Sequence, residues 1–185
     1  MNPAVWRQLL RMAQWRVSIT VPWRDKCVIC VAPHTSNWDF LLGYAAWRSL
    51  GRQACFLMKE SWFFFPLGIL LRSLGGIPVP KKRGVDLTAS IVNRFNAADR
   101  LNLAVTPEGT RARTYIWRKG FLYIAYGAGV PIQLGVIDYR TKTVIVQEEY
   151  DPSGDLETDM NFIRKFYEDY ADAALKPEKF GHLDF

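Results

Sequence analysis

The chain has 185 residues, a formal net charge of +6 at pH 7 and 49 % hydrophobic residues. This length allows one domain to bury a sizeable core, so neither a metal nor a disulfide is needed to hold the fold. The three cysteines, an odd number, suit a reducing compartment better than a secreted disulfide framework.

The first segment of the chain, residues 3–20, is predicted to form an amphipathic helix. Arg7 and Arg11 fall on one side of this helix, and Trp6 and Leu9 fall on the other. Such a helix can lie in a membrane interface or pack on its own domain, and the pattern leaves both interpretations open. The arginines that interrupt the apolar residues argue against a signal peptide.

From residue 27 onward, strand-like and helix-like segments alternate. The predicted strands cover 27–32, 54–58, 76–79, 101–105, 131–138 and 143–147. The predicted helices cover 38–50, 62–73, 85–98, 117–128 and 156–174. This alternation predicts an α/β fold: a single domain with a mixed, mostly parallel sheet flanked by helices. Reactive groups are then expected in the loops that leave the strands.

Two apolar stretches bear on membrane contact. The uncharged run 120–137 is near the minimum length for spanning a bilayer, but it contains four glycines and a proline, so a buried helix followed by a buried strand is expected. The stretch ESWFFFPLGILLRSLGG (60–76) is too short to span. It fits a core helix, a wall for an acyl chain or an element that dips into a membrane.

Positive charge is concentrated in the first two thirds of the chain. Residues 1–120 carry 18 Lys and Arg against 6 Asp and Glu, whereas residues 121–185 carry 6 against 12. A basic region rich in aromatic residues could meet nucleic acid, anionic lipid or an acidic carrier protein. We expect no nucleic-acid partner, because the arginines form no recognition motif and the aromatic residues form no stacking platform.

The stretch VAPHTSNWDF (31–40) places His34 between a predicted strand and a predicted helix. Residues 35–37 are typical helix N-cap residues, and Asp39 falls in the first helical turn. An extended chain would separate the histidine from the aspartate by about 16 Å, but a turn followed by a helix brings them together. The carboxylate would then fix the tautomer of the ring and leave the other nitrogen to accept a proton from a hydroxyl. An ordinary histidine in a capping turn is the alternative.

A second polar loop, VTPEGTRAR (105–113), follows the strand predicted at 101–105. It is expected at the same end of the sheet as His34. Gly109 allows a ligand to approach the backbone closely, and Arg111 offers a planar fork for a phosphate. The alternative is a turn with solvated charges.

Four segments resemble, in order, the four sequence blocks of the glycerolipid acyltransferase family, whose best known members are the 1-acylglycerol-3-phosphate acyltransferases. They are HTSNWD (34–39), LGGIPVPKKR (74–83), TPEGTR (106–111) and GVPI (129–132). The resemblance covers roughly residues 27–140. It implies an enzyme that moves a fatty acyl group from acyl-CoA or an acyl carrier protein to the hydroxyl of a lysolipid, with no cofactor and no covalent acyl-enzyme. In that scheme His34 is the general base and Asp39 orients it.

The resemblance further implies that Glu108, Gly109, Thr110 and Arg111 bind the glycerol phosphate of the acceptor. The second block departs from the family pattern, because Pro80 and Lys81 stand where an aspartate and an arginine are common. Lys81 or Arg83 is therefore expected to neutralise the phosphate. A lysine would do so as a point charge, without the bidentate fork of an arginine. The departure leaves the headgroup of the acceptor open.

Because a lysolipid and its product reside in a bilayer, the resemblance also implies peripheral attachment to the cytoplasmic side of the cell membrane. We predict a membrane-interacting helical segment over residues 1–24 and an acyltransferase domain over 25–185. The basic surface would be attracted to anionic lipid and to an acidic acyl carrier protein.

Overall fold

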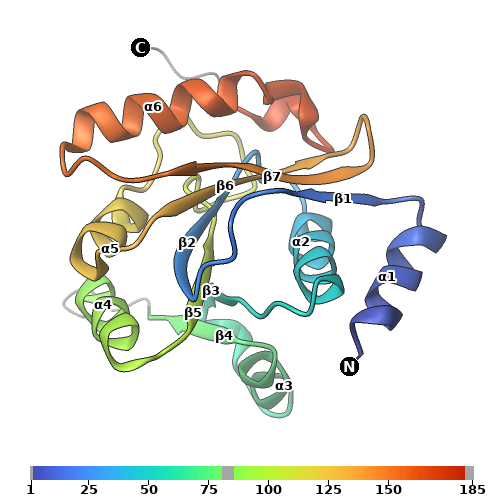
Figure 1. Ribbon diagram of the computed structural model, residues 1–185, viewed down its shortest axis with the longest axis horizontal. Helices are drawn as coiled ribbons and strands as arrows, with labels where there is room; N and C mark the ends of the chain where they lie inside the picture. The colour runs from blue at the N-terminus through green and yellow to red at the C-terminus, as the bar shows by residue number, and fades with distance from the viewer. Residues whose placement is uncertain (1, 81–85, 182–185) are drawn as a thin grey trace.

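A seven-stranded sheet runs through the protein in the order β1-β7-β6-β2-β5-β3-β4 (Figure 1). The computed structural model describes residues 2–80 and 86–181. The strands are β1 (Arg16–Ile19), β2 (Lys26–Val31), β3 (Cys55–Lys59), β4 (Gly76–Val79), β5 (Leu101–Val105), β6 (Ile132–Asp138) and β7 (Thr143–Tyr150). Neighbouring strands are parallel except β6 and β7, which are antiparallel. The predicted α/β fold with a mixed, mostly parallel sheet is confirmed.

Helices cover both faces of this sheet. They are α1 (Pro3–Met12), α2 (Asn37–Ser49), α3 (Leu67–Ser73), α4 (Leu87–Ala97), α5 (Gly120–Ala128) and α6 (Leu156–Glu168), with 3₁₀ turns η1 (Glu60–Trp62), η2 (Ala171–Ala173) and η3 (Pro177–Lys179). Helices α4, α5 and α6 contribute to the larger hydrophobic core, and α2 contributes Trp47 to a smaller core. The central strand therefore needs apolar side chains on both faces, which explains why its sequence reads KCVICV.

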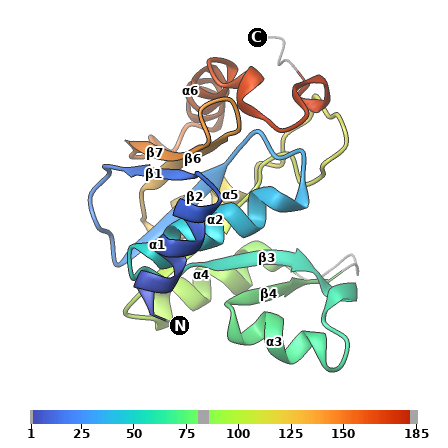
Figure 2. The ribbon, with the colours of Figure 1, turned by 90° about the vertical axis from the view of Figure 1, so that its right-hand side faces the viewer.

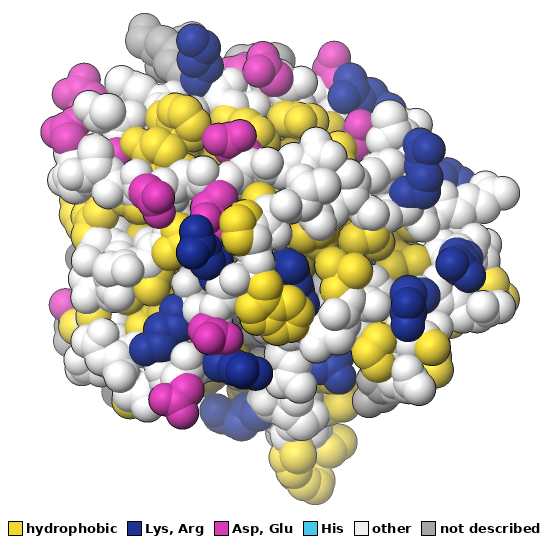
Figure 3. All heavy atoms as spheres, in the orientation of Figure 1, with side chains coloured by type: hydrophobic (Ala, Val, Ile, Leu, Met, Phe, Trp, Pro, Cys, Tyr) yellow, Lys and Arg dark blue, Asp and Glu magenta, His cyan; other side chains and the backbone are white. Residues whose placement is uncertain are grey.

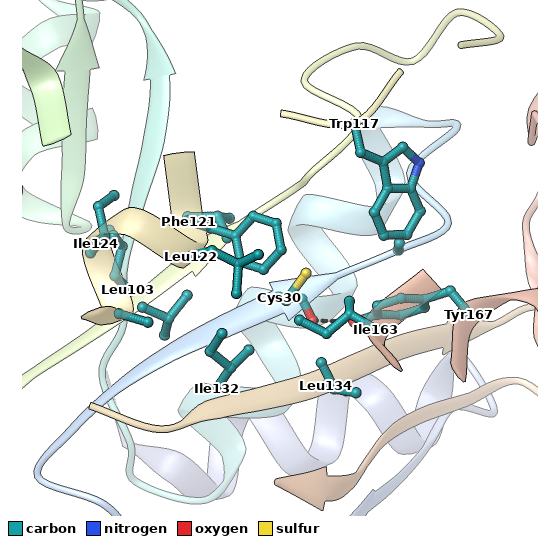
Figure 4. Packing of buried hydrophobic residues seen from close by; sticks show 14 of the residues in the cluster. Cys30, Leu103, Trp117, Phe121, Leu122, Ile124, Ile132, Leu134, Ile163 and Tyr167 are labelled. Carbon is teal, nitrogen blue, oxygen red and sulfur yellow. Dashed lines mark hydrogen bonds between the residues drawn. The ribbon is translucent and has the colours of Figure 1, made fainter. Parts of the chain in front are cut away.

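Strand β2 shows this division residue by residue. Val28 and Cys30 pack in the larger core, whereas Cys27 and Ile29 pack in the smaller one. Figure 4 shows Cys30 beside the ring of Tyr167. The hydroxyl of this fully buried tyrosine donates a hydrogen bond to the carbonyl oxygen of Cys30 at 2.6 Å, so its polar group is satisfied inside the core. This bond ties α6 to the strand that leads into the His34 turn.

The N-terminal segment differs from its prediction. The helix predicted over residues 3–20 ends at Met12, and Arg16–Ile19 form β1, which pairs with β7. Gln14 turns the chain with a φ of 61°. The physical reason is that the open edge of β7 supplies backbone partners for a short segment whose Val17 and Ile19 are β-branched. The prediction of a continuous helix was wrong there.

Helix α1 packs on α2 rather than standing apart from the domain. The ring of Trp6 meets Tyr44 edge to face at 5.5 Å, and Leu10 is buried. The apolar side chains of Val5, Leu9 and Met12 remain exposed. Helix α1 is thus joined to its own domain, while membrane contact by its outer face stays a prediction.

The two apolar stretches resolve differently. Residues 120–137 form α5 and β6, separated by a C-cap at Gly129, as expected. The predicted helix 62–73 is divided instead into η1 and α3, because Pro66 has no N–H and disfavours a helical conformation at Phe65. In the described part of the chain, no helix has both the length and the apolar character required to cross a bilayer.

The five strands from β2 to β6 run parallel to one another, so their carboxyl ends lie at the same end of the sheet. The loops that follow β2, β3 and β5 all lie on the right-hand side of Figure 2. Residues 34, 60–66 and 106–118 belong to these loops. The fold therefore gathers the two polar loops singled out in the sequence at one end of the sheet, as expected for an α/β fold.

Candidate active site

His34 and Asp39 meet at the turn between β2 and α2. The imidazole Nδ1 of His34 lies 3.0 Å from Oδ2 of Asp39. The reversal is built by the helix cap: Ser36 is the N-cap of α2, and its backbone N–H donates to Asp39 at 2.9 Å in a capping box. The predicted contact between the two side chains is confirmed.

The carboxylate of Asp39 is buried, with 3 % of its surface exposed, and four donors reach it. Besides His34 and Ser36, the backbone N–H of Thr35 donates to Oδ2 at 2.9 Å, and the hydroxyl of Tyr139 donates to Oδ1 at 2.6 Å. Three of the donors share Oδ2 and the fourth binds Oδ1, so both oxygens of the carboxylate are engaged. Asp39 is therefore held in one position by the ring of His34, by the backbone of the turn and by the hydroxyl of Tyr139.

Tyr139 is a site residue that the sequence analysis missed. It follows β6, which pairs with β2, so its hydroxyl reaches across to the first turn of α2. Burial, the hydrogen bond to Asp39 and the negative charge of that carboxylate all raise the pKa of Tyr139. The phenol consequently stays protonated and acts as a donor. A tyrosine at the carboxyl end of a predicted strand was the only signal that could have marked it.

The contact with Asp39 decides the tautomer of His34. Because Nδ1 faces a carboxylate, the neutral ring carries its proton there, which leaves a lone pair on Nε2. No hydrogen bond engages Nε2 within the described residues, and the side chain is 17 % exposed. The ring can therefore accept a proton from a group that enters from solvent.

Glu108 lies behind the His34 turn. Its Oε2 accepts a hydrogen bond from the backbone N–H of His34 at 2.7 Å, and only 6 % of the residue is exposed. Burial raises the pKa of Glu108 to about 8, against the lowering effect of the hydrogen bond from His34, and the charge of Asp39 raises it further. The structure thus places this residue against the backbone of His34.

Replacing Glu108 by glutamine is expected to stabilise the protein increasingly as the pH rises from about 4.5 to 8. The folded-state pKa lies above the unfolded one, so the stability contributed by the protonated group is present below pH 4.5 and is lost as the pH rises towards 8. Glutamine keeps an oxygen for the His34 N–H and cannot ionise. Urea unfolding at several pH values should show a difference that grows by about 1.4 kcal/mol per pH unit.

The exposed Glu60 provides the matched control for this measurement. Glu60→Gln should show a pH-independent difference from the parent protein, because an exposed carboxylate has a similar environment in both states. A pH-independent difference for Glu108→Gln as well would contradict the raised pKa.

The loop that contains TPEGTR joins the His34 turn directly. Gly109 has a φ of +63°, which a glycine adopts without strain. The hydroxyl oxygen of Thr110 accepts a hydrogen bond from the backbone N–H of Ala112. The guanidinium of Arg111 donates to the side-chain oxygen of Asn37 at the start of α2. The predicted proximity of the two loops is therefore confirmed. Asn37, as the residue that fixes Arg111, was not foreseen.

Two predicted phosphate ligands cannot be placed. Lys81 and Arg83 fall in the segment 81–85, which lies outside the described residues. Strand β4, which precedes them, is parallel to β3, so its carboxyl end lies at the same end of the sheet as the His34 turn. Their contact with an acceptor stays a prediction.

A comparison with protein families bears on this arrangement. A family model described as acyltransferase matches residues 16–136, which is more than half of the chain. The chain belongs to the glycerolipid acyltransferase family. A search of curated proteins gives no match. The matched region runs from β1 nearly to the end of β6, so it includes the His34–Asp39 pair and the 106–111 loop.

A cleft beside the His34 turn gives this acyltransferase room for a ligand. It has a volume of about 520 Å³. Its lining residues are Thr35, Ser36, Asn37, Trp38, Thr110, Arg111, Ala112, Lys176 and Lys179. Residues 35–38 lie between His34 and Asp39 in the chain, so the cleft adjoins the turn that carries the pair, while neither His34 nor Asp39 is among its lining residues. Lys176 and Lys179 come from the C-terminal segment, which the sequence analysis had not connected with the site.

Proposed function

We propose that this acyltransferase moves a fatty acyl group from acyl-CoA or an acyl carrier protein to the hydroxyl of a lysolipid such as 1-acylglycerol-3-phosphate. The observation that carries the proposal is the His34–Asp39 pair: a ring nitrogen held by a buried carboxylate, with the other nitrogen unengaged among the described residues and a polar cleft beside it.

In the proposed reaction, Nε2 of His34 accepts the proton of the acceptor hydroxyl. At the same time, the oxygen of that hydroxyl attacks the carbonyl carbon of the thioester. The new C–O bond forms, the C–S bond breaks, and the departing thiolate takes a proton from the imidazolium. Asp39 stabilises that imidazolium through its hydrogen bond at Nδ1. No external oxidant, metal or cofactor is needed for this exchange.

The chemistry of the cysteines supports direct transfer rather than a cysteine acyl-enzyme. Burial raises the pKa of the Cys27 thiol to about 12, and burial also raises the pKa of Cys30 and Cys55. Each thiol is therefore protonated at neutral pH, whereas the thiolate is the nucleophilic form.

For the acceptor, we propose that Gly109, Thr110 and Arg111 bind the glycerol phosphate, together with Lys81 or Arg83. Glu108 would contribute by fixing the backbone of His34, since its carboxyl group contacts that N–H. The proline and lysine in the second block favour a second candidate: a hydroxylated lipid acceptor without the usual phosphate.

The function is tested by incubating the purified enzyme with a panel of lysolipids and both thioester donors, and identifying the products by mass. Lysophosphatidate should be converted to phosphatidate. Products only from acceptors without phosphate would favour the second candidate, and no acylated lipid from any pair of substrates would refute acyl transfer to lipids.

We further propose that the enzyme binds peripherally to the cytoplasmic side of the cell membrane, with an anionic lipid surface as its partner. Exposed apolar side chains around α3 support this: Phe65 is 83 % exposed and Ile69 is 65 % exposed. Figure 3 shows a hydrophobic projection at the foot of the molecule, where α3 lies in Figure 1. The exposed face of α1 would add a second contact, and the basic first two thirds of the chain would add attraction to anionic headgroups.

Flotation with liposomes that contain anionic lipid tests this attachment. The variant Phe65→Asp/Ile69→Asp should float about tenfold less than the parent protein, because two charges replace exposed apolar contacts. Tyr123→Asp, at an exposed aromatic residue of α5, is the matched control and should float normally. Equal flotation of all three proteins would rule out the α3 contact, and a parent protein that ignored the liposomes would refute attachment itself.

A further inference from the structure

The cleft beside the His34–Asp39 pair is cationic. Arg111 lines it from the 106–118 loop, and Lys176 and Lys179 line it from the C-terminal segment. Among the described residues that form its wall, none is acidic. The remaining polar lining consists of hydroxyls and an amide. Such a set of groups suits an anion that carries several acceptor oxygens.

The C-terminal segment is fastened to both loops of the site. The backbone N–H of Lys176 donates to the hydroxyl oxygen of Thr35 at 3.3 Å, which ties the segment to the His34 turn. Phe180 is buried and forms a parallel bridge with Thr114 in the 106–118 loop. Gly181 lies so close to Thr114 that an added Cβ would be 2.2 Å from its carbonyl oxygen. Lys176 and Lys179 are therefore held at the cleft by contacts on either side of them.

Arg111 is also restrained. Its guanidinium donates to Asn37, so it is held against the first turn of α2. This 13-residue helix presents its positive end to the same cleft. One planar fork, two ammonium groups and a helix N-terminus thus face one volume of about 520 Å³.

We propose that Lys176 and Lys179, together with Arg111, bind a phosphate group of a substrate in this cleft. The inference rests on the proposed function, under which that phosphate belongs either to the headgroup of a lysolipid acceptor or to the coenzyme A part of the donor. In the second block, Pro80 and Lys81 stand where an aspartate and an arginine are common, and the two lysines of the C-terminal segment add point charges beside the guanidinium that lines the cleft.

The double variant Lys176→Gln/Lys179→Gln tests the site. Two acceptors, lysophosphatidate and a monoacylglycerol, are compared, and so are two donors, acyl-CoA and acyl-pantetheine. If the phosphate is the acceptor's, the preference for lysophosphatidate over monoacylglycerol should fall about tenfold. If it is the donor's, the preference for acyl-CoA over acyl-pantetheine should fall instead. Either result supports the site and identifies its source.

Controls separate charge from folding. Lys26→Gln removes a lysine at the amino end of β2, opposite to the cleft, and should leave both preferences unchanged. Lys176→Arg/Lys179→Arg keeps the charges and should restore the preference that glutamine removes. An active double variant with both preferences intact would overturn the inference while leaving the proposed function standing.

A binding measurement separates failure of the site from failure of the proposed function. Glycerol 3-phosphate and adenosine 3′,5′-bisphosphate are titrated against tryptophan fluorescence, because Trp38 lines the cleft. The parent protein should bind one of them about tenfold more tightly than the glutamine double variant does. This result would support the phosphate site even if no lysolipid were acylated, and binding of equal strength to both proteins would overturn it.

Discussion

Replacing His34 by alanine is expected to lower kcat for acyl transfer by about 10²- to 10⁴-fold, the usual contribution of a general base. The variant loses the Nε2 lone pair that accepts the hydroxyl proton. Asp39 keeps three of its four hydrogen-bond donors, from Thr35, Ser36 and Tyr139, so the turn should remain folded. The loss should therefore appear in kcat rather than in the yield of folded protein.

Transfer of a labelled acyl group measures this effect, with circular dichroism and thermal unfolding to verify the fold. Asn93→Ala, an exposed substitution on α4 purified in the same way, controls for contaminating acyltransferases and for handling. It should retain the parent rate. If His34→Ala also retained it, the histidine would not be the base and the proposed reaction would lose its proton acceptor.

The parts of the site that could be predicted from the sequence are those within one loop. The His34–Asp39 contact spans five residues, and a strand followed by N-cap residues already implies the reversal that joins them. Predicting that the 106–111 loop lies close to His34 required one further premise, that the carboxyl ends of parallel strands lie at the same end of the sheet. Both β2 and β5 carry the apolar runs of buried parallel strands, so that premise could be read from their composition.

The contacts that could not be predicted join distant segments. Tyr139 reaches Asp39 across 100 positions, and Lys176 reaches Thr35 across 141. Neither tyrosine nor lysine is unusual where it stands, and nothing local specifies which strand lies beside β2 or where the C-terminal segment returns. The same limitation explains the error over residues 16–19, whose strand depends on the free edge of β7 rather than on their own periodicity.

Asp39→Asn is expected to lower kcat by about 10- to 10³-fold, because the amide keeps the size of the side chain but not the charge that stabilises the imidazolium. It should also destabilise the fold by about 2 kcal/mol, since charge-assisted hydrogen bonds in a buried site become neutral ones. Rates of acyl transfer and urea unfolding measure the two effects.

Asp155→Asn is the matched control. Asp155 also accepts a hydrogen bond from a backbone N–H at a helix N-terminus, from Thr158 at 2.8 Å, but it is exposed and caps α6, far along the chain from His34. It should keep the parent kcat, and a parent-like kcat in Asp39→Asn too would mean that Asp39 only caps α2 and does not orient the base.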